Sequence, residues 1–299
     1  MNETVPAQIG NYIPRQLLAM GAHAQVWQAT GPRGEVALKI ARGKDANQAL
    51  IREAEILSGA RHPNLVELVE ADPAGAWIAL QRVPGSTIDQ WAQGQPLQQV
   101  IHVTLQLIDV LEHLHRRRIV HGDVKPTNVI VDPSDDAKLI DLGIATRPGD
   151  EVEGFRGTLG YAAPELLSGK PPTPATDLYG LGALLYTCLT GRTPFVAPDP
   201  AALTYLPLVS LPPPPAAFRP DLPSTLNQLL LALLARDPSR RPTDLDRVRH
   251  TLRRCVQHKP ATPLLGMLET REALRRAVVG AADGEARVVI LYGAPGSGR

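Results

Sequence analysis

The sequence predicts an α+β fold in two lobes, a small β-rich lobe at residues 10–83 and a larger helical lobe at residues 84–258. Short apolar and β-branched runs separated by turn signals dominate the first lobe. Long stretches with apolar residues at helical spacing dominate the second lobe. Between the two lobes, Pro84-Gly85-Ser86 breaks both patterns, so we expect a hinge there.

In the first lobe a helix is expected over Asp45–Ala60, where apolar residues recur among charged ones at helical spacing. The expected strands are Gln25–Ala29, Glu35–Ile40, Leu65–Val69 and Trp77–Val83. In the second lobe the expected helices are Leu97–Arg117, Thr176–Thr190, Ser224–Arg236 and Asp244–Val256. Residues 206–223 are rich in proline, which predicts an ordered but irregular connection.

Composition narrows the functional classes. The 299 residues carry 31 Lys and Arg against 30 Asp and Glu, a balance that argues against a nucleic-acid binder or a polybasic membrane binder. Two cysteines, Cys188 and Cys255, cannot build a disulfide framework or a four-ligand zinc site. A signal peptide and an apolar run of about 20 residues are both missing from the sequence. We therefore expect a soluble, cytoplasmic chain with no nucleic-acid partner and no membrane segment in the covered part.

One loop after the first long helix gathers groups suited to phosphoryl transfer. Residues 121–128 read His-Gly-Asp-Val-Lys-Pro-Thr-Asn. Asp123 could orient an attacking hydroxyl or accept its proton, Lys125 could neutralise charge on the moving phosphoryl group, and Asn128 could coordinate magnesium. Each residue alone would most simply be an ordinary loop residue, but the combination is much less ambiguous.

Two further segments complete this constellation. Lys138-Leu139-Ile140-Asp141 predicts a strand that delivers Asp141 to a turn, where its carboxylate would be a second magnesium ligand. Lys39, on the expected strand Glu35–Ile40, needs a carboxylate partner and a phosphate, because an unpaired buried ammonium is costly. Glu53 on the following helix is the natural partner.

With these motifs in this order, the chain resembles the eukaryotic-type serine/threonine protein kinases found in bacteria, over about residues 13–256. The resemblance implies ATP and Mg²⁺ as cofactors and a protein as substrate. It makes Asp123 the catalytic aspartate, Lys125 the lysine typical of serine/threonine kinases, and Asn128 and Asp141 the metal-binding residues. The positions that match nucleotide-binding residues are Ala19, Gly21, Val26, Ala37, Lys39, Glu53 and, through backbone groups at the hinge, Gln81 and Val83.

Other matches to the family concern the frame around the site. Gly157 to Glu165 resembles the end of the activation segment, in which Thr158 is expected to support the catalytic loop. Asp177 matches the buried aspartate of the central helix in the large lobe. Arg241 is expected to pair with the glutamate that ends the activation segment.

Three departures from the family pattern matter. The glycine-rich loop, residues 19–26, keeps only Gly21 of three glycines, so positions that need a positive φ are expected to be strained. Leu142 replaces the usual Phe after Asp141, which is compatible with a packing role. Gly122 replaces the Arg that binds a phosphorylated activation loop in relatives, so control by such a phosphate loses its usual receptor.

The last residues suggest a second domain. Residues 259–266 predict a linker, and residues 267–299 predict a helix followed by a strand at Arg287–Tyr292. The following Gly293 to Arg299 resembles the beginning of a P-loop, although a plain loop with glycines is the simpler alternative. We interpret residues 267–299 as the truncated start of an NTPase-like domain of the AAA or STAND kind. This interpretation implies a downstream NTPase domain as a partner in a longer parent protein.

Two rival functions stay open. A pseudokinase scaffold that regulates an attached NTPase domain is favoured by the degraded glycine-rich loop and opposed by five intact catalytic positions. A small-molecule kinase of the same fold is opposed by Gly157 to Glu165, which resembles a peptide-positioning segment. The sequence therefore favours an active protein kinase.

Overall fold

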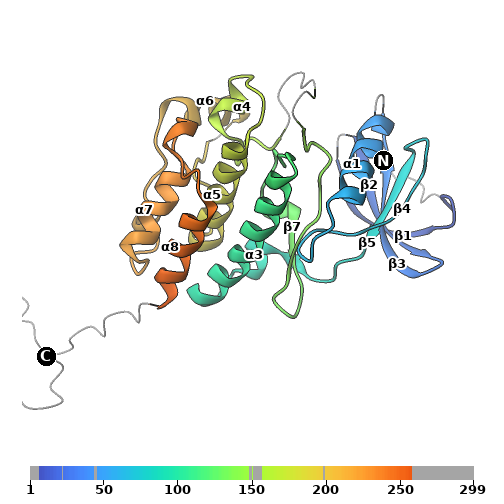
Figure 1. Cartoon of the computed structure of the whole chain (residues 1–299), viewed down its shortest axis with the longest axis horizontal. Helices are drawn as coiled ribbons and strands as arrows, with labels where there is room; N and C mark the ends of the chain where they lie inside the picture. Colours follow the sequence, from blue (N-terminus) through green and yellow to red (C-terminus); the bar gives the residue numbers. More distant parts are fainter. Residues whose placement is uncertain are drawn as a thin grey trace, which may run out of the picture. The chain divides into compact units, whose positions relative to one another are not determined.

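In the described residues, five strands form the antiparallel sheet of the N-terminal lobe, in the order β1-β2-β3-β5-β4 (Figure 1). They are β1 (Ile13–Met20), β2 (Ala24–Gly31), β3 (Gly34–Ala41), β4 (Leu68–Ala71) and β5 (Trp77–Gln81). The computed structural model describes residues 7–21, 23–43, 46–147, 150, 157–197 and 199–257. Both lobes belong to one unit, residues 1–256, and residues 257–299 form a second. The predicted linker, the strand Arg287–Tyr292 and the P-loop-like segment lie outside the described residues.

Helix α1 (Ala46–Gly59) packs on one face of this sheet. Strand β5 shows the alternation that a two-faced sheet requires. Ile78 and Leu80 belong to the core that contains the buried side of α1, whereas Ala79 belongs to a smaller cluster. The members of that smaller cluster are Tyr12, Trp27, Ala29, Val36, Leu38 and Ala79. The sheet is thus joined to α1 by one set of alternate side chains.

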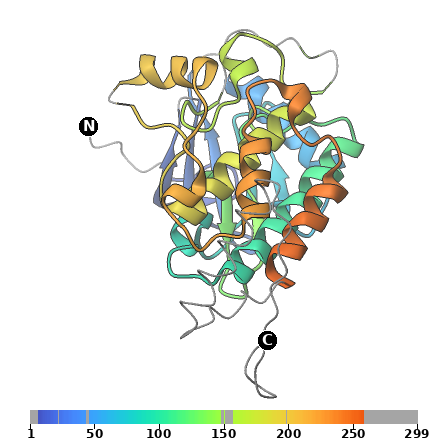
Figure 2. The same ribbon diagram turned by 90° about the vertical axis from the view of Figure 1, so that its left-hand side faces the viewer.

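The C-terminal lobe is mainly helical (Figures 1 and 2). Its helices are α2 (Ile88–Trp91), α3 (Leu97–Arg116), α4 (Pro164–Leu167), α5 (Pro174–Thr190), α6 (Pro200–Val209), α7 (Ser224–Leu233) and α8 (Leu245–Gln257). Short 3-10 turns are η1 (Pro126–Asn128), η2 (Pro215–Ala217) and η3 (Pro238–Arg240). A small sheet contains β6 (Ser86–Thr87), β7 (Val129–Val131) and β8 (Ala137–Leu139) in that order. No helix of the described residues combines the length and the apolar character that a membrane crossing requires.

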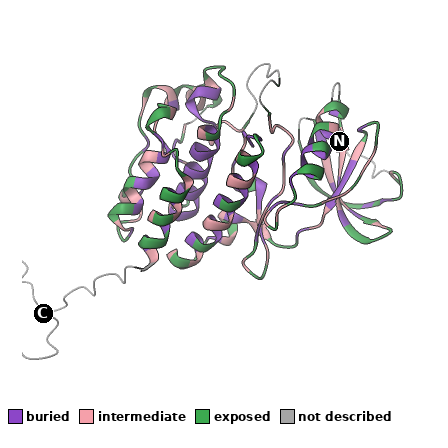
Figure 3. Cartoon of the chain, viewed as in Figure 1, coloured by how far each residue is buried: buried purple, intermediate pink, exposed green. Residues whose placement is uncertain are grey.

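Helix α5 forms the centre of this lobe, and every residue from Thr176 to Leu189 is buried (Figure 3). A helix that is apolar on all sides is a core helix. It begins at a capping box of Thr173 and Thr176 and ends at Gly191, whose φ of 70° is left-handed. A Cβ at Gly180 would lie 2.7 Å from the Val124 carbonyl oxygen, so the missing methyl group lets the loop of residues 121–128 approach α5 closely.

Among the elements that differ from the sequence prediction are β4, α6 and β1, the last of which was not predicted as a strand. Strand β4 covers Leu68–Ala71 rather than residues 65–69, because Leu65 and Val66 pair with Leu139 instead, where the Val66 N–H donates to the Leu139 carbonyl oxygen at 2.9 Å. Helix α6 was not predicted, and its last residues lie in the proline-rich stretch expected to be irregular. Its start has a clear cause, since the Asp199 carboxylate caps the helix and a proline takes the first helical position.

A buried ion pair ties α4 to the segment before α8. The Arg241 Nη1 and Nη2 atoms donate to the two carboxylate oxygens of Glu165 at 2.6 and 2.7 Å, as the sequence predicted. Arg241 also donates to the carbonyl oxygens of Ala175 and Ala235, and the Thr176 hydroxyl donates to Glu165. Both charged groups therefore have satisfied hydrogen bonds although they are buried. Breaking such a pair from one side is costly, because the remaining charge is left buried and unpaired.

We expect Arg241→Met to lower the free energy of unfolding by about 3–5 kcal/mol, because it strands the Glu165 carboxylate in the core. The neighbouring Arg240 has a side chain that is 82% exposed, so Arg240→Met is the matched control and should change the free energy by less than about 0.5 kcal/mol. Urea unfolding followed by circular dichroism measures both. Equal unfolding midpoints for the two variants would show that the pair contributes nothing.

Candidate active site

A buried carboxylate on α5 holds the loop that carries the predicted catalytic residues. Asp177 accepts the His121 N–H at 2.9 Å through Oδ2 and the Gly122 N–H at 2.8 Å through Oδ1. The Nε2 atom of His115, near the end of α3, lies 2.7 Å from Oδ2. A carboxylate with this many partners is stable in a buried position. Asp177 is buried, as predicted, and fixes the loop against α5.

Gly122 has a φ of 78°, in the left-handed region that glycine adopts without steric cost. A Cβ there would meet nothing nearer than the Ile144 carbonyl oxygen at 3.6 Å. The constraint at this position is therefore the backbone conformation and not lack of space. Where the family pattern has Arg, this chain has the one residue type that takes this conformation freely.

The predicted catalytic residues lie together on this loop. The Lys125 Nζ donates to Asp123 Oδ2 at 2.5 Å and to the Thr158 hydroxyl oxygen at 2.6 Å. The Asn128 Nδ2 donates to the Asp123 carbonyl oxygen at 2.9 Å. The His121 Nδ1 accepts the Asp123 N–H at 3.1 Å, which gives that histidine a structural role. Asp123 is thus held from several sides, and Thr158 supports the catalytic loop.

A second charged group joins three segments that are distant in the sequence. The Nζ of Lys39 on β3 lies 2.7 Å from Glu53 Oε2 on α1 and 2.8 Å from Asp141 Oδ1 after β8. Asp141 Oδ1 also accepts the Gly143 N–H at 2.9 Å, and the Leu142 N–H points to the other Glu53 oxygen at 3.4 Å. Leu142 is buried in the main core, so leucine fills the packing role expected at that position.

The electrostatics keep Lys39 and Asp141 charged. Burial works to lower the pKa of Lys39, but the Glu53 and Asp141 carboxylates raise that pKa above its ordinary value. Burial also works to raise the pKa of Asp141, but Lys39 and the Gly143 N–H outweigh it and lower the pKa to about 2. The Asp141 side chain is 41% exposed, so a charged carboxylate borders open space beside Lys39.

The turn between β1 and β2 corresponds to the glycine-rich loop. Ala19 lies opposite Val26 in the strand pair, and the Gly21 N–H donates to the Ala24 carbonyl oxygen at 2.8 Å. Among the described residues, neither Ala19 nor Ala24 has a positive φ. The strain expected from the missing glycines therefore does not arise at these two positions. Ala22 lies outside the described residues.

At the hinge, the two predicted adenine-binding residues differ in how their N–H groups are bonded. The Gln81 N–H donates to the Glu67 carbonyl oxygen at 2.8 Å and is not available to a ligand. The Val83 carbonyl oxygen accepts a hydrogen bond from the neighbouring arginine. No described group accepts the Val83 N–H. Ala37 on β3 lies opposite Leu80 of β5, the strand that leads into the hinge.

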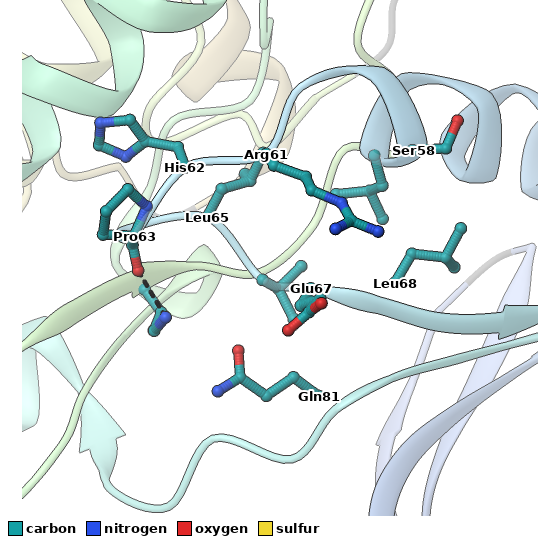
Figure 4. A pocket seen from close by; sticks show the side chains of 11 residues that line it. Ser58, Arg61, His62, Pro63, Leu65, Glu67, Leu68 and Gln81 are labelled. Carbon is teal, nitrogen blue, oxygen red and sulfur yellow. Dashed lines mark hydrogen bonds between the residues drawn. The ribbon is translucent and has the colours of Figure 1, made fainter.

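A cavity of about 390 Å³ lies beside the connection from α1 to β4 (Figure 4). Arg61 and Glu67 border it, and the Gln81 side chain points into it. Of the described residues that line this cavity, Gln81 is the one that also belongs to the predicted nucleotide site. Its side chain is thus directed to this cavity, and a contact with adenine would have to use its backbone.

One residue of the site was missed in the sequence. His115 contacts Asp177 although the two are 62 positions apart, and no local motif marks that pairing. The histidine lies in the last turn of α3, where a polar side chain normally suggests exposure to solvent. The sequence could have indicated this contact only indirectly, because a buried aspartate such as Asp177 is expected to have more than one hydrogen-bond donor.

A β-rich lobe with a buried lysine–glutamate pair, and a helical lobe in which a buried aspartate holds the loop of residues 121–128, define the protein kinase class of fold. The chain belongs to that family: the family model described as "Protein kinase domain" matches residues 12–259. Membership of this family supports the expected two-lobed fold. The matched range ends at residue 259, before residues 267–299, which were predicted as the start of an NTPase-like domain.

Curated proteins similar to this chain are named as serine/threonine kinases. A probable serine/threonine-protein kinase of Streptomyces coelicolor is 30% identical over 87% of this chain and 42% of its own length. The serine/threonine-protein kinase PrkC of Bacillus subtilis is 29% identical over 69% of this chain and 34% of its length. The human serine/threonine-protein kinase ULK3 is 31% identical over 87% of this chain and 58% of its length. The chain thus spans less than half the length of these bacterial relatives.

We expect Gly122→Ala to lower the free energy of unfolding by about 1 kcal/mol, because alanine is strained at a φ of 78°. The matched control is Gly59→Ala at the end of α1, where φ is not positive and a Cβ would meet nothing within 4 Å. That control should be neutral or slightly stabilising. Urea unfolding of both variants tests the difference, and equal stability of the two would contradict a backbone constraint at Gly122.

Proposed function

We propose that this chain is an active serine/threonine protein kinase, which transfers the γ-phosphoryl group of ATP to Ser and Thr hydroxyls of a protein. One observation carries the proposal. Lys39 is paired with both Glu53 and Asp141, while Asp123 and Asn128 meet on a loop of fixed position. A phosphoryl-transfer site needs both the charged cluster around Lys39 and the loop that carries Asp123. Its catalysis rests on positioning the reactants and on neutralising charge.

The residues fit a nucleotide with magnesium. The Asn128 Nδ2 is engaged by Asp123, which leaves the amide oxygen as a ligand atom. Asp141 binds Lys39 and Gly143 through Oδ1, which leaves Oδ2 as a ligand atom on a side chain that is partly exposed. Both are the hard oxygen ligands that Mg²⁺ prefers. No group of three or more described His, Cys, Asp and Glu side chains could hold a metal alone, so nucleotide phosphates would complete the set.

Each residue then has a defined role. Lys39, oriented by Glu53, would bind the α- and β-phosphates, and Asn128 and Asp141 would bind Mg²⁺. The bound ion would neutralise charge on the phosphates. Ala19, Gly21, Val26 and Ala37 would cover the nucleotide, and adenine would contact the Gln81 carbonyl oxygen and the Val83 N–H.

The transfer step uses two side chains of the catalytic loop. Asp123 would orient the acceptor hydroxyl and take its proton as the oxygen bonds to the γ-phosphorus. The bond between that phosphorus and the β,γ-bridging oxygen breaks, and ADP leaves with the electron pair. Lys125 lies 2.5 Å from Asp123 and would steady the γ-phosphoryl group during the transfer. Thr158 holds Lys125 in place from the activation segment.

The rival readings have less support. A pseudokinase scaffold rested on the degraded glycine-rich loop, yet Ala19 and Ala24 carry no strain, and the relatives are named as serine/threonine kinases. A small-molecule kinase would not need the contact between Lys125 and Thr158, which connects the catalytic loop to the segment expected to position peptides.

We expect Asp123→Ala and Asp141→Ala each to reduce phosphoryl transfer by about 10²- to 10⁴-fold, since one removes the orienting carboxylate and the other a magnesium ligand. Asp136→Asn is the matched control, because Asp136 is exposed and its side chain takes no part in the contacts of Lys39, Asp123 and Asp141 given above. Incorporation of label from γ-labelled ATP into a generic protein substrate measures the rate. Near wild-type transfer in either alanine variant would rule out the mechanism.

The domain limits remain part of the proposal. We propose a kinase N-lobe at residues 10–83, a C-lobe at residues 84–258, a linker at residues 259–266 and an NTPase-like segment at residues 267–299. The P-loop-like Gly293 to Arg299 supports an NTPase domain as partner in a longer parent protein. Two unpaired cysteines, both buried, support a cytoplasmic location.

We expect calorimetry to show one Mg·ATP site per chain and to lose it in Lys39→Ala/Asp141→Ala protein, because both phosphate and metal contacts are removed. The control, Lys170→Ala/Asp136→Asn, changes two exposed residues of the same charges and should bind like the wild type. Stoichiometric binding that persists in the first variant and disappears on deletion of Gly293 to Arg299 would place a second nucleotide site in the P-loop-like segment.

A further inference from the structure

A second cavity, of about 570 Å³, opens between α2, the loop that follows it and the C-terminal end of α5. Asp89 lines it from α2, and Thr187 and Cys188 line it from α5. None of the described residues assigned to the nucleotide, the metal or the transfer step lines this cavity. It is therefore a separate feature of the C-terminal lobe.

Asp89 is the residue of this cavity with an unsatisfied hydrogen-bond acceptor. Its Oδ1 atom is buried and has no hydrogen-bond partner among the described residues. Leaving a buried acceptor unsatisfied is unfavourable, and the penalty is larger for a charged group. A donor that arrives from outside the chain would remove that penalty.

The charges around the cavity indicate what the donor must be. The cation that lines the cavity is Arg219, which already has partners. Its Nε lies 3.5 Å from Asp221 Oδ2, and its Nη1 donates to the Leu189 carbonyl oxygen at 3.5 Å. Asp89 therefore supplies a negative charge that no described cation compensates, and the complementary ligand is a cation.

The cavity lies between elements that also carry or hold the candidate site. Helices α2 and α5, which line it, contact each other, and Asp177 of α5 holds the catalytic loop through the N–H groups of His121 and Gly122. Helix α2 also contacts η1, the turn that ends at the metal-binding position.

We propose that this cavity receives a basic side chain of the protein substrate and that Asp89 binds its ammonium or guanidinium group. The inference rests on the proposed function and makes its substrate class more specific, namely proteins with Lys or Arg close to the accepting Ser or Thr. Asp89 is then a specificity-determining residue. Charge-assisted hydrogen bonds are stronger than neutral ones, so one such contact can dominate the choice among peptides.

The test uses the full chain and a set of Ser and Thr peptides in which each flanking position is Ala, Lys or Glu in turn. The wild type should prefer Lys over Ala at one position by about tenfold or more in kcat/KM. Asp89→Asn should bring that ratio close to one, mainly through KM, and Asp89→Lys should shift the preference to Glu at the same position. Asp136→Asn is the control and should keep the wild-type ratio.

Two further measurements make the outcome decisive. Gln93→Lys places a cation at the cavity from an exposed position and should also reduce the preference for Lys, which covers the case of an Asp89 variant that does not fold. Fluorescence anisotropy of the Lys and Ala peptides measures binding without catalysis. A wild type with no preference for a basic residue, or a preference that survives Asp89→Asn, overturns the inference. Asp89-dependent binding of the Lys peptide without any transfer would instead defeat the proposed function and leave this inference standing.

Discussion

The position of the candidate site depends on the carboxylate of Asp177. It lies on the fully buried part of α5, accepts two N–H groups of the catalytic loop and contacts His115 from α3. A carboxylate without exposed surface has to be hydrogen-bonded, and a buried loop N–H that loses such an acceptor is also unfavourable. The carboxylate thus needs the N–H groups of the loop, and these N–H groups need the carboxylate. Asp123 follows directly after the bonded residues, so its location is determined by α5, which carries none of the residues proposed for the transfer step.

The ionic contacts of Lys39 complement this arrangement. Lys39 and Glu53 belong to the N-terminal lobe, and Asp141 belongs to the segment after β8 in the other lobe. The one ammonium of Lys39 pairs with both carboxylates, one in each lobe. A movement of the lobes apart would therefore break at least one of these ion pairs. The Lys39 ammonium is a charged contact between the lobes, and its neighbour Asp141 is partly open to solvent. Backbone hydrogen bonds such as that from the Val66 N–H to the Leu139 carbonyl oxygen also join the lobes.

Much of this organisation could be predicted from the sequence, because the informative signals are short. The order of Lys39, Glu53, Asp123 and Asp141 indicated the pairing that the structure contains, and the long core helices had clear periodicity. Strand β1 was missed because nearly all of its residues are exposed, so it lacks the alternation that marks a half-buried strand. Contacts such as that of His115 were missed because they depend on how distant segments pack. The partnerless oxygen of Asp89 is also a property of packing, and no pattern in the residues around it predicts that state.

The closeness of Gly180 to Val124 has a consequence for how this enzyme family can vary. A single hydrogen in place of a methyl group sets how deep the catalytic loop sits, since a Cβ at Gly180 would come within 2.7 Å of a backbone oxygen. A descendant with alanine at this position would retain every ionisable group of the site, but the loop that carries its aspartate or α5 would have to shift. A survey that compares only the charged positions would count such a protein as intact. The defect would be one of spacing, and its cause would lie in a residue of α5 that carries none of the proposed catalytic groups.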